Sequence, residues 1–301
     1  MKKIFFLGLA FSGIFFCLSV QATDNNLPSA DSWVYQLQDA DINALSQTAY
    51  DIVVIDYAQD GTDDEAYTNE QIKSLQASGK IVLAYLSIGE AEDYRFYWQT
   101  TWNDAAPDWL GPENENWAGN YKVRYWHDGW WNDALLPYLN RIEAAGFDGV
   151  YLDIIDGYYY WGKHGYGVQK SANRMVKLIK KIRENFNTNN NEVIICPQNG
   201  ETIIDDASKK YRNIYWANID CIGIEDLFYN STKSDKLYRK KILNRFAEHD
   251  KTILNVEYIK EEKEADYLNK SKNQLFSIIP YRADSDRELN FIPVQSSALV
   301  Q

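Results

Sequence analysis

The stretch that decides the fold is Gly146-Phe-Asp-Gly-Val-Tyr-Leu-Asp-Ile-Ile-Asp-Gly157. Gly146 is typical of the end of a helix, and the apolar residues around 150–152 predict a short strand. Two carboxylates, Asp153 and Asp156, follow as that strand ends. Because ligands of parallel α/β proteins bind at the carboxyl ends of the strands, both acids are candidates for a ligand site. Either one alone can also cap the next helix or pair with an arginine, and that alternative stays open.

Seven other apolar runs are similar to the one at 150–152, and segments with helical spacing separate them. The runs at 52–56 and 81–87 are almost continuously apolar, as in strands that are buried on both faces of a parallel sheet. No repeat or linker divides the chain, so the pattern predicts an α/β fold, a single-domain (β/α)8 TIM barrel. The eight predicted strands span residues 33–37, 52–56, 81–87, 150–152, 193–197, 219–224, 252–256 and 275–279.

The two ends of the 301-residue chain lie outside the predicted barrel. Lys2 and Lys3 precede an apolar run, and Val20-Gln-Ala22 is a small-residue cleavage site, as in a secretory signal peptide. We therefore expect an exported protein, secreted or periplasmic, that has no membrane association after cleavage near Ala22. The predicted segments are a signal peptide at 1–22, a leader at 23–30, the barrel domain at 31–285 and a C-terminal tail at 286–301.

Between the third and fourth strands, residues 91–131 form a long insertion that is rich in aromatic residues. A loop of that length is usually functional or disordered, and its eleven Trp and Tyr residues argue against disorder. We expect several of these rings to lie over the active face and to stack on a ligand, with Tyr94 and Trp126 as candidates. Tyr158 belongs to a second aromatic run, directly after the fourth strand, and is a further candidate.

Composition excludes several classes of function. A formal net charge of -12 is a poor match for nucleic acid and suits a neutral or cationic polymer. The three histidines are scattered without metal-binding spacing, so we expect neither a metal nor another cofactor. Export permits a disulfide between Cys196 and Cys221, but the sequence alone leaves their pairing open.

Acidic and amide side chains follow six of the eight predicted strands. They are Asp56 after the second, Glu90 after the third, Asp153 after the fourth, Gln198 and Asn199 after the fifth, Glu225 after the sixth and Glu257 after the seventh. The fourth and sixth strands have the same parity in the barrel, so Asp153 and Glu225 can face each other across its mouth. Glycoside hydrolysis requires such a pair, with one carboxyl group protonated, while amides and further acids bind sugar hydroxyl or amino groups.

Three motifs occur in order along the chain: Tyr85-Leu-Ser-Ile-Gly-Glu-Ala-Glu-Asp-Tyr-Arg95, Asn120-Tyr-Lys-Val-Arg-Tyr-Trp126 and Gly146-Phe-Asp-Gly-Val-Tyr-Leu-Asp153. Together they resemble glycoside hydrolase family 114, the endo-α-1,4-polygalactosaminidases and related bacterial and archaeal barrel proteins. The resemblance covers about residues 33–281 and implies a (β/α)8 barrel that needs no metal. It also implies an endo-acting hydrolase of an α-linked, galactosamine-containing polysaccharide. The retaining mechanism implied by the family needs two carboxyl groups about 5–5.5 Å apart.

By that resemblance, Asp153 takes the place of the nucleophile and Glu225 that of the acid/base. The residues that would then bind substrate or support the site are Asp56, Glu90, Tyr94, Arg95 and Asp156. The rings, amides and acid named above complete the predicted binding set: Trp126, Tyr158, Gln198, Asn199 and Glu257. Three alternatives stay open: Glu257 as the acid, Asp56 paired with an internal Lys or Arg, and Arg95 orienting a carboxylate. Fungal members carry Pro-Asp-Asn around the nucleophile, where this chain has Leu152-Asp153-Ile154, so another α-linked sugar also stays open.

The competing function is a non-catalytic carbohydrate-binding barrel, associated with exopolysaccharide or envelope machinery, because fold alone does not fix function. The two hypotheses differ in whether Asp153 and Glu225 both point into one cleft. A metal-dependent polysaccharide deacetylase would need clustered histidine and aspartate ligands, and the histidines of this chain are scattered. On either hypothesis we expect a monomer that has a polysaccharide as its partner, and neither nucleic acid nor a membrane.

Overall fold

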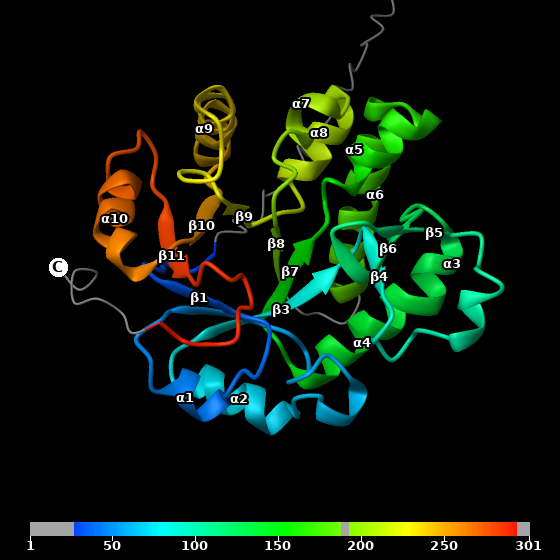
Figure 1. The fold of residues 1–301 in the computed structure, drawn as a ribbon, viewed down its shortest axis with the longest axis horizontal. Helices are drawn as coiled ribbons and strands as arrows, with labels where there is room; N and C mark the ends of the chain where they lie inside the picture. The colour runs from blue at the N-terminus through cyan, green and yellow to red at the C-terminus, as the bar shows by residue number, and fades with distance from the viewer. Residues whose placement is uncertain (1–26, 188–192, 294–301) are drawn as a thin grey trace, which may run out of the picture.

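The computed structural model describes residues 27–187 and 193–293, and the predicted signal peptide and the end of the predicted tail lie outside these ranges. Within the described residues, eight parallel strands follow one another around a barrel in chain order (Figure 1). The arrangement confirms the predicted α/β fold with TIM-barrel architecture. The strands are β1 (Trp33–Gln36), β2 (Ile52–Ile55), β3 (Ile81–Ser87), β7 (Gly149–Asp153), β8 (Ile194–Pro197), β9 (Cys221–Glu225), β10 (Thr252–Tyr258) and β11 (Ile279–Ala283).

The barrel consists of two parallel sheets that meet at two seams. One sheet has the strand order β1-β2-β3-β7-β8, and the other β11-β10-β9. At the first seam, one backbone bridge pairs Gln198 with Gly223, and a disulfide joins Cys196 of β8 to Cys221 of β9. At the second seam, a side chain of β1 reaches β11, where the Trp33 indole N–H donates to the Ile279 carbonyl at 3.0 Å. Cys196 and Cys221, whose pairing the sequence left open, therefore form a disulfide across the seam at which a single backbone bridge joins the two sheets.

The eighth strand is displaced from its predicted position. The prediction placed it at 275–279, whereas β11 spans Ile279–Ala283 and the Leu275 side chain is 98% exposed. Pro280 obscured the strand, because a proline inside an apolar run argues against a central strand. β11 forms a ladder only with β10, so it is an edge strand, where a residue without an N–H is tolerated.

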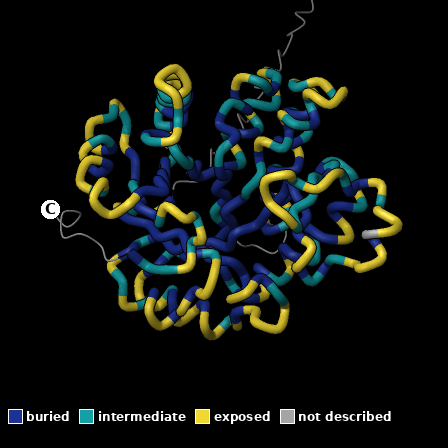
Figure 2. The backbone as a smooth tube through the Cα atoms, viewed as in Figure 1, coloured by how far each residue is buried: buried dark blue, intermediate teal, exposed yellow. Residues whose placement is uncertain are grey.

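Helices cover the outside of the barrel, and the buried residues follow the strands at its centre (Figure 2). α2 (Asn69–Ala77) begins with a capping box, in which Thr68 and Gln71 each accept the other's backbone N–H. α6 (Val168–Asn187) buries an apolar face that includes Met175 and Ile179, as its spacing predicts. The other helices are α1 (Ile42–Ser46), α3 (Asp128–Trp130), α4 (Leu136–Ala145), α5 (Gly157–Trp161), α7 (Ile203–Asp206), α8 (Lys209–Trp216), α9 (Lys233–Ala247) and α10 (Glu264–Lys272).

The segment between β3 and β7 contains a small sheet of its own. β4 (Glu90–Glu92), β5 (Leu110–Asn114) and β6 (Trp117–Val123) are antiparallel, in the order β4-β6-β5. Several rings of the segment pack on one another, as Trp109 does against Trp102 and Trp130, with ring centroids 4.9 and 5.1 Å apart. These rings form a core instead of the ligand-stacking surface that the sequence suggests. Tyr94 and Trp117 are the large exposed rings of the segment, at 48% and 58% exposure.

The last barrel helix is absent from the described residues, and residues 284–293 take its place as an irregular segment, here called the C-terminal strap. The backbone N–H of Leu37, directly after β1, donates to the Leu289 carbonyl at 2.9 Å. The Tyr50 hydroxyl donates to the Pro293 carbonyl at 3.2 Å. The strap therefore spans the gap between β11 and β1.

Removal of the disulfide should destabilise the fold. The bond closes a chain separation of 25 residues, so replacing Cys196 and Cys221 together by alanine should cost about 3 kcal/mol of unfolding free energy. The measurement is thermal unfolding of the chain from residue 23, with and without a reductant. Reductant should lower the Tm of the wild type and leave that of the double-alanine variant unchanged. An equal response of both proteins would contradict a disulfide across this seam.

Candidate active site

The carboxyl ends of the barrel strands open into one cavity with a volume of about 840 Å³. The β4-β6-β5 sheet and the C-terminal strap both contribute to its walls. Nine carboxylates line it: Asp39, Asp56, Asp60, Glu90, Glu92, Asp153, Asp156, Glu225 and Glu288. Three basic side chains do so, namely Arg95, Lys122 and Arg287. The excess of carboxylates makes the cavity strongly negative and favourable for a cation.

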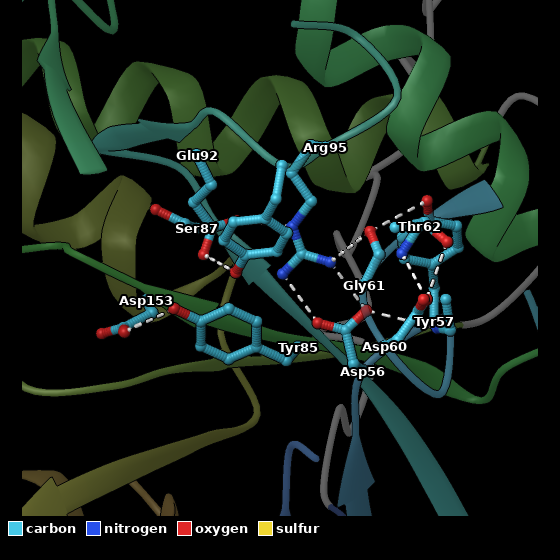
Figure 3. Close-up of polar contacts among 12 residues, drawn as sticks. Asp56, Tyr57, Asp60, Gly61, Thr62, Tyr85, Ser87, Glu92, Arg95 and Asp153 are labelled. Carbon is cyan, nitrogen blue, oxygen red and sulfur yellow. Dashed lines mark hydrogen bonds and ion pairs between the residues drawn. The ribbon is translucent and has the colours of Figure 1, made fainter. Parts of the chain in front are cut away.

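Asp153 and Glu225 line this same cavity, at the ends of β7 and β9. The Tyr85 hydroxyl donates to Asp153 Oδ2 at 2.9 Å (Figure 3), and the backbone N–H of Ile154 donates to its Oδ1 at 2.7 Å. Glu225 accepts from the Asn199 side-chain amide at 2.7 Å, and from the Tyr258 hydroxyl. Each carboxyl group is therefore held in place by two donors.

The cavity keeps a proton on this pair. Burial and, after it, the negative charge of Glu225 raise the pKa of Asp153 to about 8, although the Ile154 N–H and the Tyr85 hydroxyl oppose the rise. Two interacting carboxyl groups titrate as a unit, so the pair as a whole retains one proton up to about pH 8. One charged and one protonated carboxyl group is the combination that acid-assisted substitution at a sugar needs.

The backbone turns sharply where β7, β8 and β9 end. Ile154, Asn199 and Asp226 have φ angles of 57°, 55° and 53°, in the left-handed region. That conformation is uncommon for residues other than glycine, and for a β-branched residue such as isoleucine it is a strained outlier. Gly89 makes the turn at Ile154 possible, since a Cβ at Gly89 would lie 2.3 Å from the Ile154 carbonyl oxygen. Three of the seven non-glycine residues with a positive φ among the described residues therefore stand directly beyond strands whose ends line the cavity.

Arg95 is buried beside the cavity and binds two carboxylates (Figure 3). Its Nη1 and Nη2 donate to Asp56 at 2.8 and 2.7 Å, and its Nε donates to Glu92 at 2.8 Å. Burial raises the pKa of Asp56, and the positive charge of Arg95 opposes that rise. Both open alternatives hold here: Asp56 is paired with an internal arginine, and Arg95 orients carboxylates. Glu92 was not among the predicted binding residues. It lies two residues after Glu90, and residues two apart in a strand such as β4 point to the same face.

Glu90 and Asp156 lie in the cavity but differ in their partners. Glu90 pairs with Lys122 at 3.0 Å and also accepts from the Asn114 amide at 3.0 Å. Asp156 is exposed to the solvent of the cavity, and in the described part of the chain its carboxylate has no side-chain hydrogen-bond partner. The surrounding protein raises the pKa of Asp156, and the charge of Glu90 raises it further. Of these two acids, Asp156 is thus the one more available to a ligand.

Glu257 lies outside the cavity, contrary to the predicted binding role. Its carboxylate is buried and accepts the backbone N–H of Phe228 at 2.6 Å and that of Tyr229 at 3.3 Å. Successive side chains of a strand point to opposite faces, and on β10 it is Tyr258 that reaches the cavity. Glu257 therefore cannot act as the alternative acid in this arrangement.

Two predicted aromatic contacts also lie outside the cavity. Trp126 packs against Trp161, with ring centroids 5.6 Å apart. Tyr158 is fully buried and donates to a carboxylate of α7. Trp117 and Tyr160 line the cavity instead, and neither was singled out from the sequence. In a helix such as α5, residues two apart lie on different faces, which is why Tyr160 reaches the cavity and Tyr158 the core.

The other predicted binding residues do line the cavity: Asp56, Glu90, Tyr94, Arg95, Asp156, Gln198 and Asn199. Among the residues that the structure describes, no cluster of three or more His, Cys, Asp or Glu side chains is arranged to hold a metal ion. No helix in the same ranges combines the length and the apolar character needed to cross a membrane.

Comparison with known sequences identifies relatives along most of the chain. A sequence profile of glycoside hydrolase family GH114 matches residues 18–294. An uncharacterized protein of Methanocaldococcus jannaschii, MJ1477, is 40% identical over 289 residues, which cover 90% of this chain and 80% of the relative. An uncharacterized protein of Thermotoga maritima is 36% identical over 312 residues, covering 96% of this chain and 92% of the relative.

Two solved structures have the same fold at low sequence identity. The glycoside hydrolase domain of PelA from Pseudomonas aeruginosa superposes with a TM-score of 0.66 at 13% identity, covering 88% of this chain and 98% of that domain. Ega3 of Aspergillus fumigatus, solved in complex with galactosamine, superposes with a TM-score of 0.60 at 17% identity, covering 87% of this chain and 94% of Ega3. At such identities the likeness supports the barrel fold alone.

Because the pKa of Asp153 is raised, the unfolding free energy should depend on pH through this group. Protonation of this group favours the folded state, so its stabilising effect is complete below about pH 4 and is lost as the pH rises towards 8. Asp153→Asn mimics the protonated form at every pH. Its Tm should equal that of the wild type near pH 4 and exceed it increasingly up to pH 8, by about 2–4 °C per kcal/mol.

The measurement is thermal unfolding of both proteins from pH 4 to 9. Asp104→Asn is the matched control, because Asp104 is exposed and does not line the cavity. A Tm difference for Asp153→Asn that stays constant over the whole range would contradict the raised pKa.

Proposed function

Because this chain belongs to glycoside hydrolase family GH114, we propose that it is an exported, endo-acting glycosidase that cleaves an α-linked, galactosamine-containing polysaccharide. The observation that carries the proposal is the pair of carboxyl groups at the ends of β7 and β9. Both line one cavity, and burial leaves them one shared proton up to about pH 8. Perturbed carboxyl pKa values in a cleft are typical of catalytic sites, which favours a glycosidase over a carbohydrate-binding barrel without activity.

In the proposed mechanism, Asp153 attacks the anomeric carbon while Glu225 gives its proton to the leaving oxygen. A water then hydrolyses the glycosyl–Asp153 ester with Glu225 as the base, so that the anomeric configuration is retained. The raised pKa of Asp153 favours the proton on that residue before substrate binds. The proton must therefore move to Glu225 when the substrate arrives, and a cationic sugar beside Asp153 favours this shift by stabilising its negative charge.

The charges of the cavity support a substrate that carries amino groups. All three basic side chains of the cavity are already paired with carboxylates: Arg95 with Asp56 and Glu92, Lys122 with Glu90, and Arg287 with Asp226. Among the residues that the structure describes, Asp156 has no such partner, so it can accept an ammonium group or sugar hydroxyls. The exposed rings of Tyr94 and Trp117 offer flat apolar surfaces for the sugar faces. The similar Ega3 structure contains galactosamine, which is consistent with this substrate class.

Export is supported by two independent features of the chain. The disulfide between Cys196 and Cys221 is of a kind that persists in oxidising compartments outside the cytosol. The N-terminal residues carry the pattern of a secretory signal peptide. A polysaccharide outside the cytoplasm is a substrate that such a protein would meet.

Loss of either carboxyl group should abolish cleavage. The assay measures release of soluble oligosaccharides from partly deacetylated poly-galactosamine. Asp153→Asn and Glu225→Gln should each fall at least about a thousandfold, roughly 4 kcal/mol of transition-state stabilisation. Asp104→Asn and Glu70→Gln are matched controls, since both acids are exposed and lie outside the cavity. If the folded wild type binds the polymer and releases nothing, the hydrolase proposal fails for this substrate, and a carbohydrate-binding role takes its place.

Activity should fall as the pH rises through about 8, because the pair then loses its remaining proton and no acid is left for the leaving group. The measurement is kcat/KM from pH 5 to 10. The amino groups of the polymer also titrate, so binding to Asp153→Asn over the same range separates their contribution from that of the pair. A kcat/KM that stays constant from pH 6 to 10 would contradict the shared proton.

A further inference from the structure

The C-terminal strap contributes to the cavity itself. Arg287, Glu288 and Leu289 all line it, although they follow the last barrel strand. Arg287 and Leu289 have φ angles of 68° and 52°, in the left-handed region. A residue other than glycine in that region costs about 1–3 kcal/mol and persists only where its surroundings impose it. The bond between the Leu37 N–H and the Leu289 carbonyl, at 2.9 Å, is one such constraint.

The Arg287 guanidinium makes two side-chain contacts. It lies over the ring of Tyr258, with 4.1 Å between Cζ and the ring centroid, and it forms an ion pair with Asp226. Such a stacked, planar and permanently charged group fixes both partners in orientation. A lysine would supply the charge without the planar stack.

Both partners of Arg287 are linked to Glu225, one through a hydrogen bond and the other through the backbone. The Tyr258 hydroxyl donates to Glu225 Oε1. Asp226 is the next residue along the chain, in the left-handed turn that ends β9, and its backbone N–H donates to the Val256 carbonyl at 3.1 Å. One guanidinium thus restrains the ring that binds the Glu225 carboxyl group and the backbone turn that presents it.

We propose that Arg287 is a positioning residue for Glu225, acting through Tyr258 and Asp226, and that the C-terminal strap is part of the active site. This inference rests on the proposed glycosidase function for its kinetic consequences. Arg287 would orient the acid/base without contacting the substrate. The charged and titratable groups that face Glu225 from the surrounding elements are Asp153, Tyr35, Tyr151, Tyr258, Asp226 and Arg287, with Arg239 on its backbone carbonyl.

The kinetic test compares Arg287→Gln with wild type. We expect kcat to fall about 10- to 100-fold, a part of what a positioned acid/base contributes, with KM within twofold. The acidic limb of the pH profile should move to higher pH, because one positive charge beside the pair is gone. In Arg287→Lys, the acidic limb should return closer to its wild-type position than kcat does to its wild-type value, because lysine keeps the charge without the planar stack. Arg245→Gln is the matched control, since Arg245 also pairs with an aspartate but lies outside the cavity.

A double-mutant cycle with Tyr258→Phe separates positioning from a purely structural role. If Arg287 acts through Tyr258, its replacement should cost clearly less in the Tyr258→Phe background than in the wild type. Fully additive effects, an unchanged pH profile, or a raised KM with kcat unchanged would each overturn the proposal.

A second measurement does not depend on activity, so it tests Arg287 even if no polymer is cleaved. A hydroxyl proton in a strong, shielded hydrogen bond gives a downfield proton resonance, and that of Tyr258 is assigned by its absence in Tyr258→Phe. We expect this resonance to broaden or disappear in Arg287→Gln and to persist in Arg245→Gln. A resonance that is unchanged in Arg287→Gln would show that the strap does not hold Tyr258 on Glu225. Absence of cleavage by wild type would instead refute the proposed function alone.

Discussion

Asp153 and Glu225 line one cavity, and the raised pKa of Asp153 is the constraint on which much of the surrounding structure depends. Burial and the charge of Glu225 raise the pKa of Asp153 to about 8, so the pair holds a proton at pH values where isolated carboxyl groups would not. Tyr85 and the Ile154 N–H hold one carboxyl group, and Tyr258 and Asn199 hold the other. Around them, three further acids of the cavity, Asp56, Glu92 and Glu90, are paired with Arg95 or Lys122. The barrel thereby combines a negative cleft with two carboxyl groups whose protonation remains available for chemistry.

This arrangement costs stability, which the fold recovers elsewhere. Left-handed residues stand at the ends of three adjacent strands, and two more stand in the C-terminal strap. Against these costs act the continuous apolar core of the strands, the disulfide between β8 and β9, and the buried bonds of Arg95. Strain of this kind is typical of functional sites, where a fixed geometry matters more than the most stable local conformation.

The sequence predicted the barrel and the two central acids because both rest on short-range signals. An apolar run followed by Asp153 or Glu225 marks a strand end, and in a parallel barrel all strand ends share one face. Finer placement depends on side-chain direction. Glu257 and Tyr258 are neighbours, and only the register of β10 decides that the tyrosine faces the cavity. Trp126 and Trp117 carry the same ring, and packing within the β4-β6-β5 region decides that only Trp117 reaches the cleft. The role of Arg287 depends on a segment without regular secondary structure, which leaves no periodic pattern to detect.

The shared proton is the central claim, and the titration of the Asp153 carboxyl carbon tests it most directly. Carbon-13 NMR of the unliganded protein, labelled in the aspartate carboxyl groups and assigned with Asp153→Asn, reports the protonation of this residue without any substrate. We predict that its chemical shift changes with a midpoint near pH 8. A midpoint near the ordinary aspartate value of about 4 would contradict the claim, because Asp153 would then be charged at neutral pH and would not hold the proton of the pair.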